Sequence, residues 1–126
     1  NENMQKDFQV FVLPNLYGDI ITDEAAQIQG GMGTAGSANI GNQYAMFEAV
    51  HGSAPRMVEE GIQDRANPES LLKAAELMLR HIGYAKKADR LRKAVDTAAA
   101  DKSLRMTGTK DGSSTDDFTE AVLKAL

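Results

Sequence analysis

Apolar stretches separated by polar and glycine-rich segments predict a succession of strands and helices along this chain. The nearly continuous apolar run Phe8–Leu13 is typical of a strand covered on both faces. A helix is predicted over Asp19–Gln29, with Ala25, Ala26 and Ile28 as its packing positions. Gly30–Gly41 is too rich in glycine for a helix and is expected to be a loop or an irregular strand. Tyr44–Val50 then predicts a short strand.

The second half of the chain has the period of amphipathic helices. After a long connection, His51–Pro68, Asn67 is suited to cap a helix whose first residue is Pro68. This helix is expected to run to Ile82 and to end at Gly83. Its apolar face would consist of Leu71, Leu72, Ala75, Met78, Leu79 and Ile82.

Two further helices are predicted towards the C-terminal end. The first covers Tyr84–Ala100, with Ala85, Ala88, Leu91, Val95 and Ala98 directed inwards. Its charged residues form a solvated face made of Lys86, Lys87, Asp89, Arg90, Arg92 and Lys93. After a polar loop, Met106–Thr115, a last helix is capped by Thr115 or Asp116 and packs through Phe118, Ala121, Val122 and Ala125.

Composition narrows the classes of partner. The chain has 126 residues and a mass of 13.6 kDa, and its 14 basic and 18 acidic residues give a net charge of −4. This balance gives no reason to expect nucleic acid or an anionic membrane as a partner. Cysteine is absent, which rules out a disulfide framework and a thiol nucleophile. No apolar run approaches the roughly 20 residues that span a bilayer.

The number of predicted strands is too small for a complete parallel sheet. A single strand with two covered faces needs neighbours to pair its backbone groups. The chain also begins at Asn1 rather than at a methionine. We therefore expect it to be part of a longer protein.

Two aspartates at the start of the first predicted helix are candidate metal ligands. Asp19 and Asp23 are four residues apart, which places them on one helical face with Cβ atoms roughly 5–6 Å apart. Carboxylates this close repel each other unless a cation lies between them, and magnesium is commonly bound by one or two carboxylates together with water and substrate. The alternative is that both are N-terminal acids favoured by the helix dipole.

Several motifs give this chain a specific resemblance. They read Asn-Leu-Tyr-Gly-Asp-Ile-Ile-Thr-Asp over 15–23, Gly-Gly-Met-Gly over 30–33, Ser-Ala-Asn-Ile-Gly over 37–41, Phe-Glu-Ala-Val over 47–50 and His-Gly-Ser-Ala-Pro over 51–55. In this order they closely resemble the C-terminal part of the β-decarboxylating dehydrogenases, which act on isocitrate, 3-isopropylmalate, homoisocitrate and tartrate. The resemblance covers essentially the whole chain. It implies a three-layer α/β fold, with 1–30 a remnant of the small dimer-forming domain and 31–126 part of the cofactor-binding domain.

The resemblance also assigns chemistry to particular residues. It implies that Asp19 and Asp23 bind Mg²⁺ or Mn²⁺, which chelates a hydroxy-acid substrate and polarises the carbonyl that forms when hydride leaves for the nicotinamide cofactor. The loop His51-Gly52-Ser53-Ala54-Pro55 is expected to wrap the adenosine half of that cofactor. Glu48 would lie beside the nicotinamide and Asn67 would contact the adenine. The catalytic lysine and tyrosine and a third metal-binding aspartate of the family lie upstream, so this chain alone is expected to be inactive.

One glycine motif is rejected as a fingerprint. Gly31, Gly33 and Gly36 spell G-x-G-x-x-G, but the dinucleotide-binding motif follows a strand and opens a helix. Here the motif follows a predicted helix and opens no helix. We expect these glycines to let the backbone pass close to substrate or nicotinamide.

Two arginines favour NADP over NAD. In the resembled family, NAD-using members usually carry an aspartate where this chain has Arg56, and a guanidinium can instead pair with a 2′-phosphate. Arg105 could add a second charge, although surface arginine is an alternative interpretation of both. The segment between Pro55 and Asn67 departs from the family by its length and by Val58-Glu59, and an inward-pointing Glu59 or Glu60 would oppose a phosphate.

The resemblance favours NADP-dependent isocitrate dehydrogenase, an oxidoreductase of the tricarboxylic acid cycle. The alternatives are a 3-isopropylmalate or homoisocitrate dehydrogenase and a non-catalytic regulatory subunit, against which the presence of both Asp19 and Asp23 argues. The residues that read the substrate lie outside this chain. For the intact enzyme the resemblance implies a homodimer in the cytoplasm, or in the mitochondrial matrix of a eukaryote.

Overall fold

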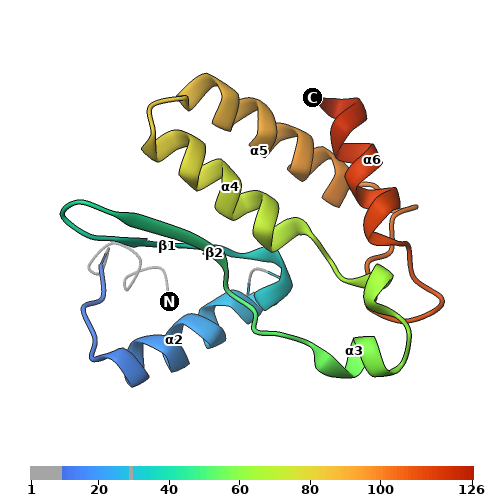
Figure 1. The fold of residues 1–126 in the computed structure, drawn as a ribbon, viewed down its shortest axis with the longest axis horizontal. Coiled ribbons are helices and arrows are strands. Elements are labelled where there is room, and N and C mark those ends of the chain that lie inside the picture. The colour runs from blue at the N-terminus through green and yellow to red at the C-terminus, as the bar shows by residue number, and fades with distance from the viewer. Residues whose placement is uncertain (1–9, 29) are drawn as a thin grey trace.

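Helices lie on both sides of a two-stranded hairpin in the computed structural model, which describes residues 10–28 and 30–126 (Figure 1). In chain order the elements are α2 (Asn15–Ile28), the 3-10 turn η1 (Met32–Thr34), β1 (Gly36–Ile40), β2 (Ala45–Ala49), α3 (Pro55–Glu59), the 3-10 turn η2 (Gln63–Arg65), α4 (Glu69–His81), α5 (Ala85–Ala99) and α6 (Thr115–Ala125).

The hairpin separates two helical layers. Its strands are antiparallel, with Gly36 opposite Ala49 and Ile40 opposite Ala45. Side chains alternate between the faces of a strand, and in β2 Ala45, Phe47 and Ala49 are half-buried whereas Met46 and Glu48 are exposed. Helix α4 contacts both strands and covers the half-buried face, where the Phe47 ring lies 5.4 Å from that of His81. The Glu48 face is directed towards α2, and α5 packs on the far side of α4 (Figure 1).

The apolar core lies between the last two helices rather than under the hairpin. Ala94, Val95 and Ala98 of α5 are buried against Phe118 and Val122 of α6. Burying side chains such as Phe118 and Val95 contributes about 1.5–3 kcal/mol each. This core therefore anchors the C-terminal half of the chain.

A capping box starts α6. The Oγ of Ser114 accepts a hydrogen bond from the backbone N–H of Asp117 at 3.1 Å, and Oδ2 of Asp117 accepts one from the N–H of Ser114 at 2.8 Å. The backbone N–H of Ser114 is the main reason that the pKa of Asp117 lies below its ordinary value. The cap is thus Ser114 and not Thr115 or Asp116, because only Ser114 precedes an acid by the three residues that a capping box requires.

Helix α4 clamps the open end of the hairpin. The buried Ser70 donates through Oγ to the carbonyl of Ala35 and accepts from the N–H of Val50 at 3.2 Å. That N–H also reaches the Ala35 carbonyl at 3.3 Å. These three residues form what we call the Ser70 clamp. Beside it, a Cβ at Gly36 would lie 2.5 Å from the backbone nitrogen of Ala74, so the close approach of α4 is sufficient to require glycine at 36.

Ion pairs explain the acidic residues buried on α4. Glu69 pairs with Lys73 at 2.6 Å, and Glu76 pairs with Arg80 at 2.6 Å. Arg80 also reaches Asp89 of α5 at 2.9 Å and so links the two helices. Its hydrogen bond to Glu76 is the main reason that the pKa of Arg80 is raised.

The strand predicted over Phe8–Leu13 is wrong for the residues that the structure describes. Phe8 and Gln9 lie outside the described residues, and residues 10–13 form no strand, with the side chains of Val10 and Val12 exposed. In the described part of the chain, β1 and β2 pair only with each other. A strand over this apolar run would need a paired neighbour, and neither described strand provides one.

The first helix begins earlier than predicted. The N–H of Gly18 donates to the carbonyl of Pro14 at 2.8 Å, and α2 starts at Asn15 rather than near Gly18. Asp19 and Asp23 therefore lie in its second and third turns, where the dipole of the helix end no longer explains them. Of the three predicted packing positions only Ala26 is buried, whereas Ala25 and Ile28 are exposed. This follows from the position of α2 at the edge of the molecule.

The predicted connection before α4 and the predicted apolar faces of the last three helices were partly wrong. The predicted connection His51–Pro68 contains α3 and η2, and Leu71, Met78 and Ile82 are exposed because α4 buries Ser70 and Ala74 instead. Ala85 and Ala125 are exposed at the ends of their helices, and Ala94 joins the core.

Three predictions are confirmed. They are the strand over Tyr44–Val50, the solvated face of α5 and the helix stop at Gly83, whose φ is 89°. Within the described residues, no helix combines the length and the apolar character needed to cross a bilayer.

Candidate functional site

The two predicted metal ligands line a cavity between α2 and the hairpin. Its volume is about 530 Å³, and we call it the carboxylate cavity. Helix α2 contributes Asp19, Thr22 and Asp23, and the strands contribute Ser37, Asn39 and Glu48. The loop after β2 closes one side with Val50, His51 and Gly52.

Local periodicity explains why these side chains converge. Residues 19, 22 and 23 follow the i, i+3, i+4 spacing of a single helical face. Ser37 and Asn39 are two apart on β1 and therefore share one face of the hairpin. Glu48 is directly opposite Ser37 in the register, and its Oε1 accepts a hydrogen bond of 2.9 Å from Nδ2 of Asn39. The hairpin thus presents polar groups to the acidic face of α2.

The donor set of this cavity fits a hard divalent cation. Asp19 and Asp23 supply exposed carboxylates, and the nearby Thr22 and Ser37 supply hydroxyls. Magnesium prefers oxygen ligands and retains several waters, so two protein carboxylates are sufficient when a substrate completes the shell. Among the described residues, no group of three acidic, histidine or cysteine side chains is arranged to hold a metal. Glu48 lines the same cavity as the two aspartates.

A second cavity adjoins the first and has a different character. It measures about 440 Å³, its wall is mostly apolar, and we call it the apolar cavity. The predicted cofactor residues His51, Gly52, Ser53, Ala54 and Asn67 all line it. Oδ1 of Asn67 accepts the N–H of Glu69 at 3.0 Å, which fixes the amide at the start of α4 and leaves Nδ2 as its donor. A flat apolar ring with an acceptor at its edge fits such a wall.

His51 and Gly52 belong to both cavities. Nδ1 of His51 lies 2.9 Å from the carbonyl oxygen of Gly52, so the imidazole contacts its own loop. A proton on Nδ1 makes this a hydrogen bond and leaves Nε2 as an acceptor. The histidine therefore stands at the boundary between the two cavities with one nitrogen committed to the loop.

The two arginines predicted to favour NADP are not part of either wall. Arg56 lies on α3 beside the apolar cavity, and its Nε forms a 2.6 Å ion pair with Oε1 of Glu60 while 85% of the side chain stays exposed. Arg105 lies in the loop before α6, where its backbone N–H donates to Oγ of Ser113 at 3.0 Å and its carbonyl accepts from the N–H of Ser113 at 2.9 Å. Arg65 of η2 donates to the carbonyl of Gly112 at 2.7 Å, which ties this loop to the segment before Asn67.

Sequence reasoning missed several residues that line the cavities. Thr22, Ser37 and Asn39 belong to the carboxylate cavity, and Met57 and Val58 belong to the apolar one. The signal for Thr22 was its spacing from Asp19, and the signal for Asn39 was the alternation along β1. Met57 and Val58 were hidden because α3 was not predicted.

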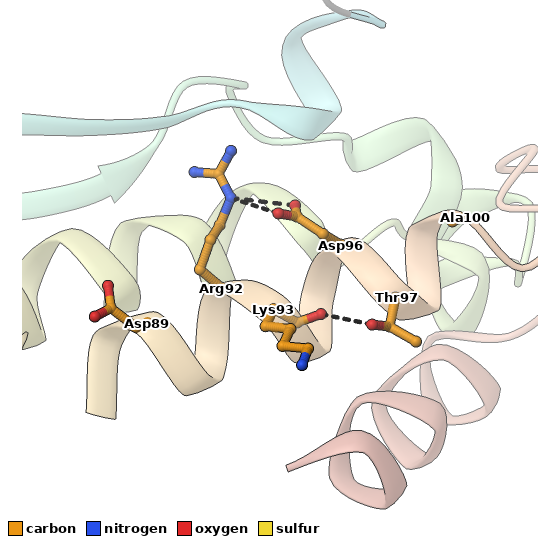
Figure 2. A pocket seen from close by; sticks show the side chains of 6 residues that line it. All are labelled: Asp89, Arg92, Lys93, Asp96, Thr97 and Ala100. Carbon is orange, nitrogen blue, oxygen red and sulfur yellow. Dashed lines mark hydrogen bonds and ion pairs between the residues drawn. The ribbon is translucent and has the colours of Figure 1, made fainter. Parts of the chain in front are cut away.

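A further hollow of about 550 Å³ runs along α5 (Figure 2). Several of its side chains are already paired. Nε of Arg92 lies 3.0 Å from Oδ2 of Asp96, Oγ1 of Thr97 donates to the carbonyl of Lys93 at 2.7 Å, and Asp89 pairs with Arg80 of α4. This agrees with the predicted solvated face, and we assign it no ligand.

Known proteins resemble the chain along nearly its whole length. Residues 2–122 match the family described as isocitrate/isopropylmalate dehydrogenase. The chain is 48% identical to the NADP isocitrate dehydrogenase of Rickettsia bellii, with 94% of this chain and 25% of that protein aligned. It is 45% identical to subunit 2 of the mitochondrial NAD isocitrate dehydrogenase of Kluyveromyces lactis, with 95% and 32% aligned.

A solved structure shows the same fold. The isocitrate dehydrogenase of Methylococcus capsulatus superposes with a TM-score of 0.83 at 40% identity, over 95% of this chain and 35% of that one. The predicted α/β fold, as the C-terminal portion of a larger architecture, is thereby confirmed. The chain spans about a quarter to a third of the length of these relatives.

Proposed function

The chain belongs to the isocitrate/isopropylmalate dehydrogenase family, and from this premise we propose that it supplies the metal-binding acids and part of the cofactor site of an oxidative decarboxylase that uses a nicotinamide cofactor. The observation that carries the proposal is the pair of adjoining cavities, one acidic and one apolar, which share His51 and Gly52. A dinucleotide needs such a pair, because its reactive ring must reach the substrate while its adenine binds elsewhere.

Asp19 and Asp23 are the residues that would hold the divalent ion, Mg²⁺ or Mn²⁺. Their spacing puts both carboxylates on the face of α2 that lines the carboxylate cavity. When bound, the ion supplies Lewis-acid polarisation of the hydroxy-acid oxygen, and the nicotinamide accepts hydride. The chain's own part is to bind and orient, with Thr22 and Ser37 adding hydroxyl groups near the two acids.

Glu48 and the apolar cavity would place the cofactor. The Glu48 carboxylate lines the same cavity as the two aspartates, which supports the proposal that it meets the positive nicotinamide ring. The apolar wall formed by Ala54, Met57 and Val58 suits an adenine, and Nδ2 of Asn67 can donate to a ring nitrogen. His51 and Ser53 would contact the ribose and phosphates through their polar atoms.

NADP is the proposed cofactor, with NAD as the alternative. Arg56 lies on α3 beside the apolar cavity and can exchange its exposed ion pair with Glu60 for a 2′-phosphate, which accepts bidentate hydrogen bonds from a guanidinium. Arg105 is proposed as a second phosphate ligand because its loop is tied to η2.

Isocitrate is the proposed substrate, since the R. bellii and K. lactis relatives are both named isocitrate dehydrogenases. We further propose a homodimer, and a cytoplasmic or mitochondrial-matrix location, on the basis of the family alone.

The test uses a graft in which this chain replaces the segment that it matches in the R. bellii enzyme. We expect the graft to oxidise isocitrate with NADP in the presence of Mg²⁺ and to prefer it over 3-isopropylmalate and homoisocitrate. Asp19→Asn and Asp23→Asn should each weaken Mg²⁺ binding at least about 100-fold, because each removes a full negative charge next to a divalent ion.

The matched control is Glu24→Gln, which removes the same charge from the same helix at a position outside the carboxylate cavity. Equal effects of the three substitutions on Mg²⁺ affinity would contradict the metal assignment. A folded graft that turns over none of the three acids with either cofactor would contradict the proposed function itself.

A further inference from the structure

We propose that Asn39 is a positioning residue that fixes the carboxylate of Glu48 for the cofactor and keeps it away from the metal-binding acids. The proposal rests on the proposed function and extends it to a residue that neither the sequence motifs nor the comparisons assign. It starts from the hydrogen bond of 2.9 Å between Nδ2 of Asn39 and Oε1 of Glu48 across the hairpin.

The register of the hairpin makes this contact possible. Glu48 is directly opposite Ser37, and Asn39 is two residues further along β1 on the same face. Such diagonal neighbours have Cα atoms about 7–8 Å apart, which a glutamate and an asparagine bridge together. Both side chains line the carboxylate cavity, so the contact lies within the site.

The charge arrangement shows what the contact is for. Asp19, Asp23 and Glu48 line one cavity, and a divalent ion bound by the two aspartates would also attract the third carboxylate. Two carboxylates and a substrate already satisfy such an ion, so a swing of Glu48 towards it would take a coordination position from substrate or water. The amide of Asn39 occupies Oε1 and opposes this swing.

The choice of an amide also matters. A lysine or arginine at position 39 would fix Glu48 equally well but would neutralise it. The neutral donor leaves the negative charge of the carboxylate available to the positive ring of the oxidised cofactor. Asn39 would therefore favour binding of the oxidised cofactor over the reduced one, through Glu48.

The hairpin provides its own control. Asn42 lies in the turn between the strands, on the same hairpin as Asn39 but outside both cavities. Replacing either asparagine with alanine removes the same amide from an exposed position. Only the change at 39 removes a donor to Glu48.

The first measurement concerns the contact and needs no activity. In the 126-residue chain labelled with ¹⁵N, Glu48→Gln should move the side-chain amide signals of Asn39 and leave those of Asn42 in place. Signals of Asn39 that stay unmoved would overturn the proposal at its starting point, whatever the fate of the proposed function.

The second measurement uses the graft. Asn39→Ala should weaken the binding of the oxidised cofactor about tenfold, as expected for loss of a hydrogen bond to a charged group, and should affect the reduced cofactor much less. Asn42→Ala should change neither affinity. The double variant Asn39→Ala/Glu48→Gln should bind the oxidised cofactor no worse than Glu48→Gln alone, because both changes act through one carboxylate.

Two outcomes would refute the role of Asn39 in a graft that works. One is an equal effect of the changes at 39 and 42 on oxidised-cofactor affinity. The other is additivity of the changes at 39 and 48. A purely structural role would lower the melting temperature and weaken both cofactor forms alike, so thermal unfolding of each variant is measured alongside. A graft that binds no cofactor contradicts the proposed function, and the amide signals then decide by themselves whether the contact exists.

Discussion

Replacing Gly36 with alanine should destabilise the fold through a backbone clash and not through the cofactor site. An added Cβ would lie 2.5 Å from the nitrogen of Ala74, 2.8 Å from the carbonyl carbon of Lys73 and 3.0 Å from the Cα of Ala74. All three atoms belong to the backbone of α4, which cannot rotate aside as a side chain can. Gly36 has no positive φ, so the backbone conformation itself does not require glycine.

The loss of stability can be judged from how far β1 and α4 must separate to make room for the added Cβ. The closest approach is about 0.9 Å short of the 3.4 Å at which ordinary contact begins, so β1 and α4 must separate. Overpacking of this kind typically costs about 1–3 kcal/mol, which is a factor of roughly 5 to 150 in the unfolding equilibrium. For a chain of this size that corresponds to a fall of about 3–5 °C in melting temperature per kcal/mol.

Thermal and urea unfolding followed by circular dichroism measure this change, with Gly52→Ala as the matched control. A Cβ at Gly52 meets no atom within 4 Å, and its φ is not positive, so this substitution should leave stability unchanged or raise it slightly. Because Gly52 lines both cavities, Gly52→Ala should instead weaken cofactor binding in the graft. Gly36→Ala is thus expected to lower stability, and Gly52→Ala is expected to lower cofactor affinity.

A Gly36→Ala chain that unfolds at the same temperature and urea concentration as the unchanged chain would contradict the backbone clash. So would a variant that keeps full stability and loses cofactor affinity. That second result would restore the interpretation that this glycine makes room for a bound molecule.

Two further predictions concern surface pairs. Glu60→Gln frees Arg56 from its ion pair, and we expect the preference of the graft for NADP over NAD, measured as the ratio of kcat/KM values, to rise about two- to fivefold. Glu59→Gln is the control, and an unchanged ratio would argue against a role for Arg56. Ser114→Ala removes the cap of α6 and should lower the free energy of unfolding by about 1 kcal/mol. Since the folded-state pKa of Asp117 lies below the ordinary 3.8, its contribution is present above pH 3.8 and is lost as the pH falls through the depressed value. Acid unfolding of the Ser114→Ala chain should show only a slightly smaller loss over this interval, because the variant keeps the backbone N–H that is the main cause of the lowered pKa. An unchanged free energy of unfolding at pH 7 would contradict the capping box.

The sequence was informative where one local rule decides the structure. The motif from Asn15 to Asp23 indicated the carboxylate cavity, because helical spacing alone brings Asp19 and Asp23 together. The motif over 51–55 supplied four of the residues that line the apolar cavity. The charged face of α5 and the stop at Gly83 likewise followed from periodicity and from the tolerance of glycine for positive φ.

Predictions failed where the answer depends on what an element packs against. The apolar run before Pro14 indicated a buried strand, yet its described residues, 10–13, form no strand. Nothing in the sequence indicated the contacts that Ser70 and Gly36 make with distant parts of the chain. The hydrogen bonds of the Ser70 clamp join residues that are 20 and 35 positions apart. Helix α3 could have been found, since Pro55 occupies its first position and Gly61, with φ of 66°, follows its end.

The Ser70 clamp fixes the open end of the hairpin to α4, and the contact between the Phe47 and His81 rings supports β2 further along. The turn of the hairpin projects away from the helices (Figure 1), whereas Ala35 and Val50 are tied to α4. The amplitude of bending in a hairpin held in this way grows with distance from the clamp. At about 3.3 Å per residue, Glu48 lies about 7 Å from the clamp and Tyr44 about 20 Å from it. We therefore expect motion of the turn to displace Glu48, which lies close to the clamp, less than Tyr44.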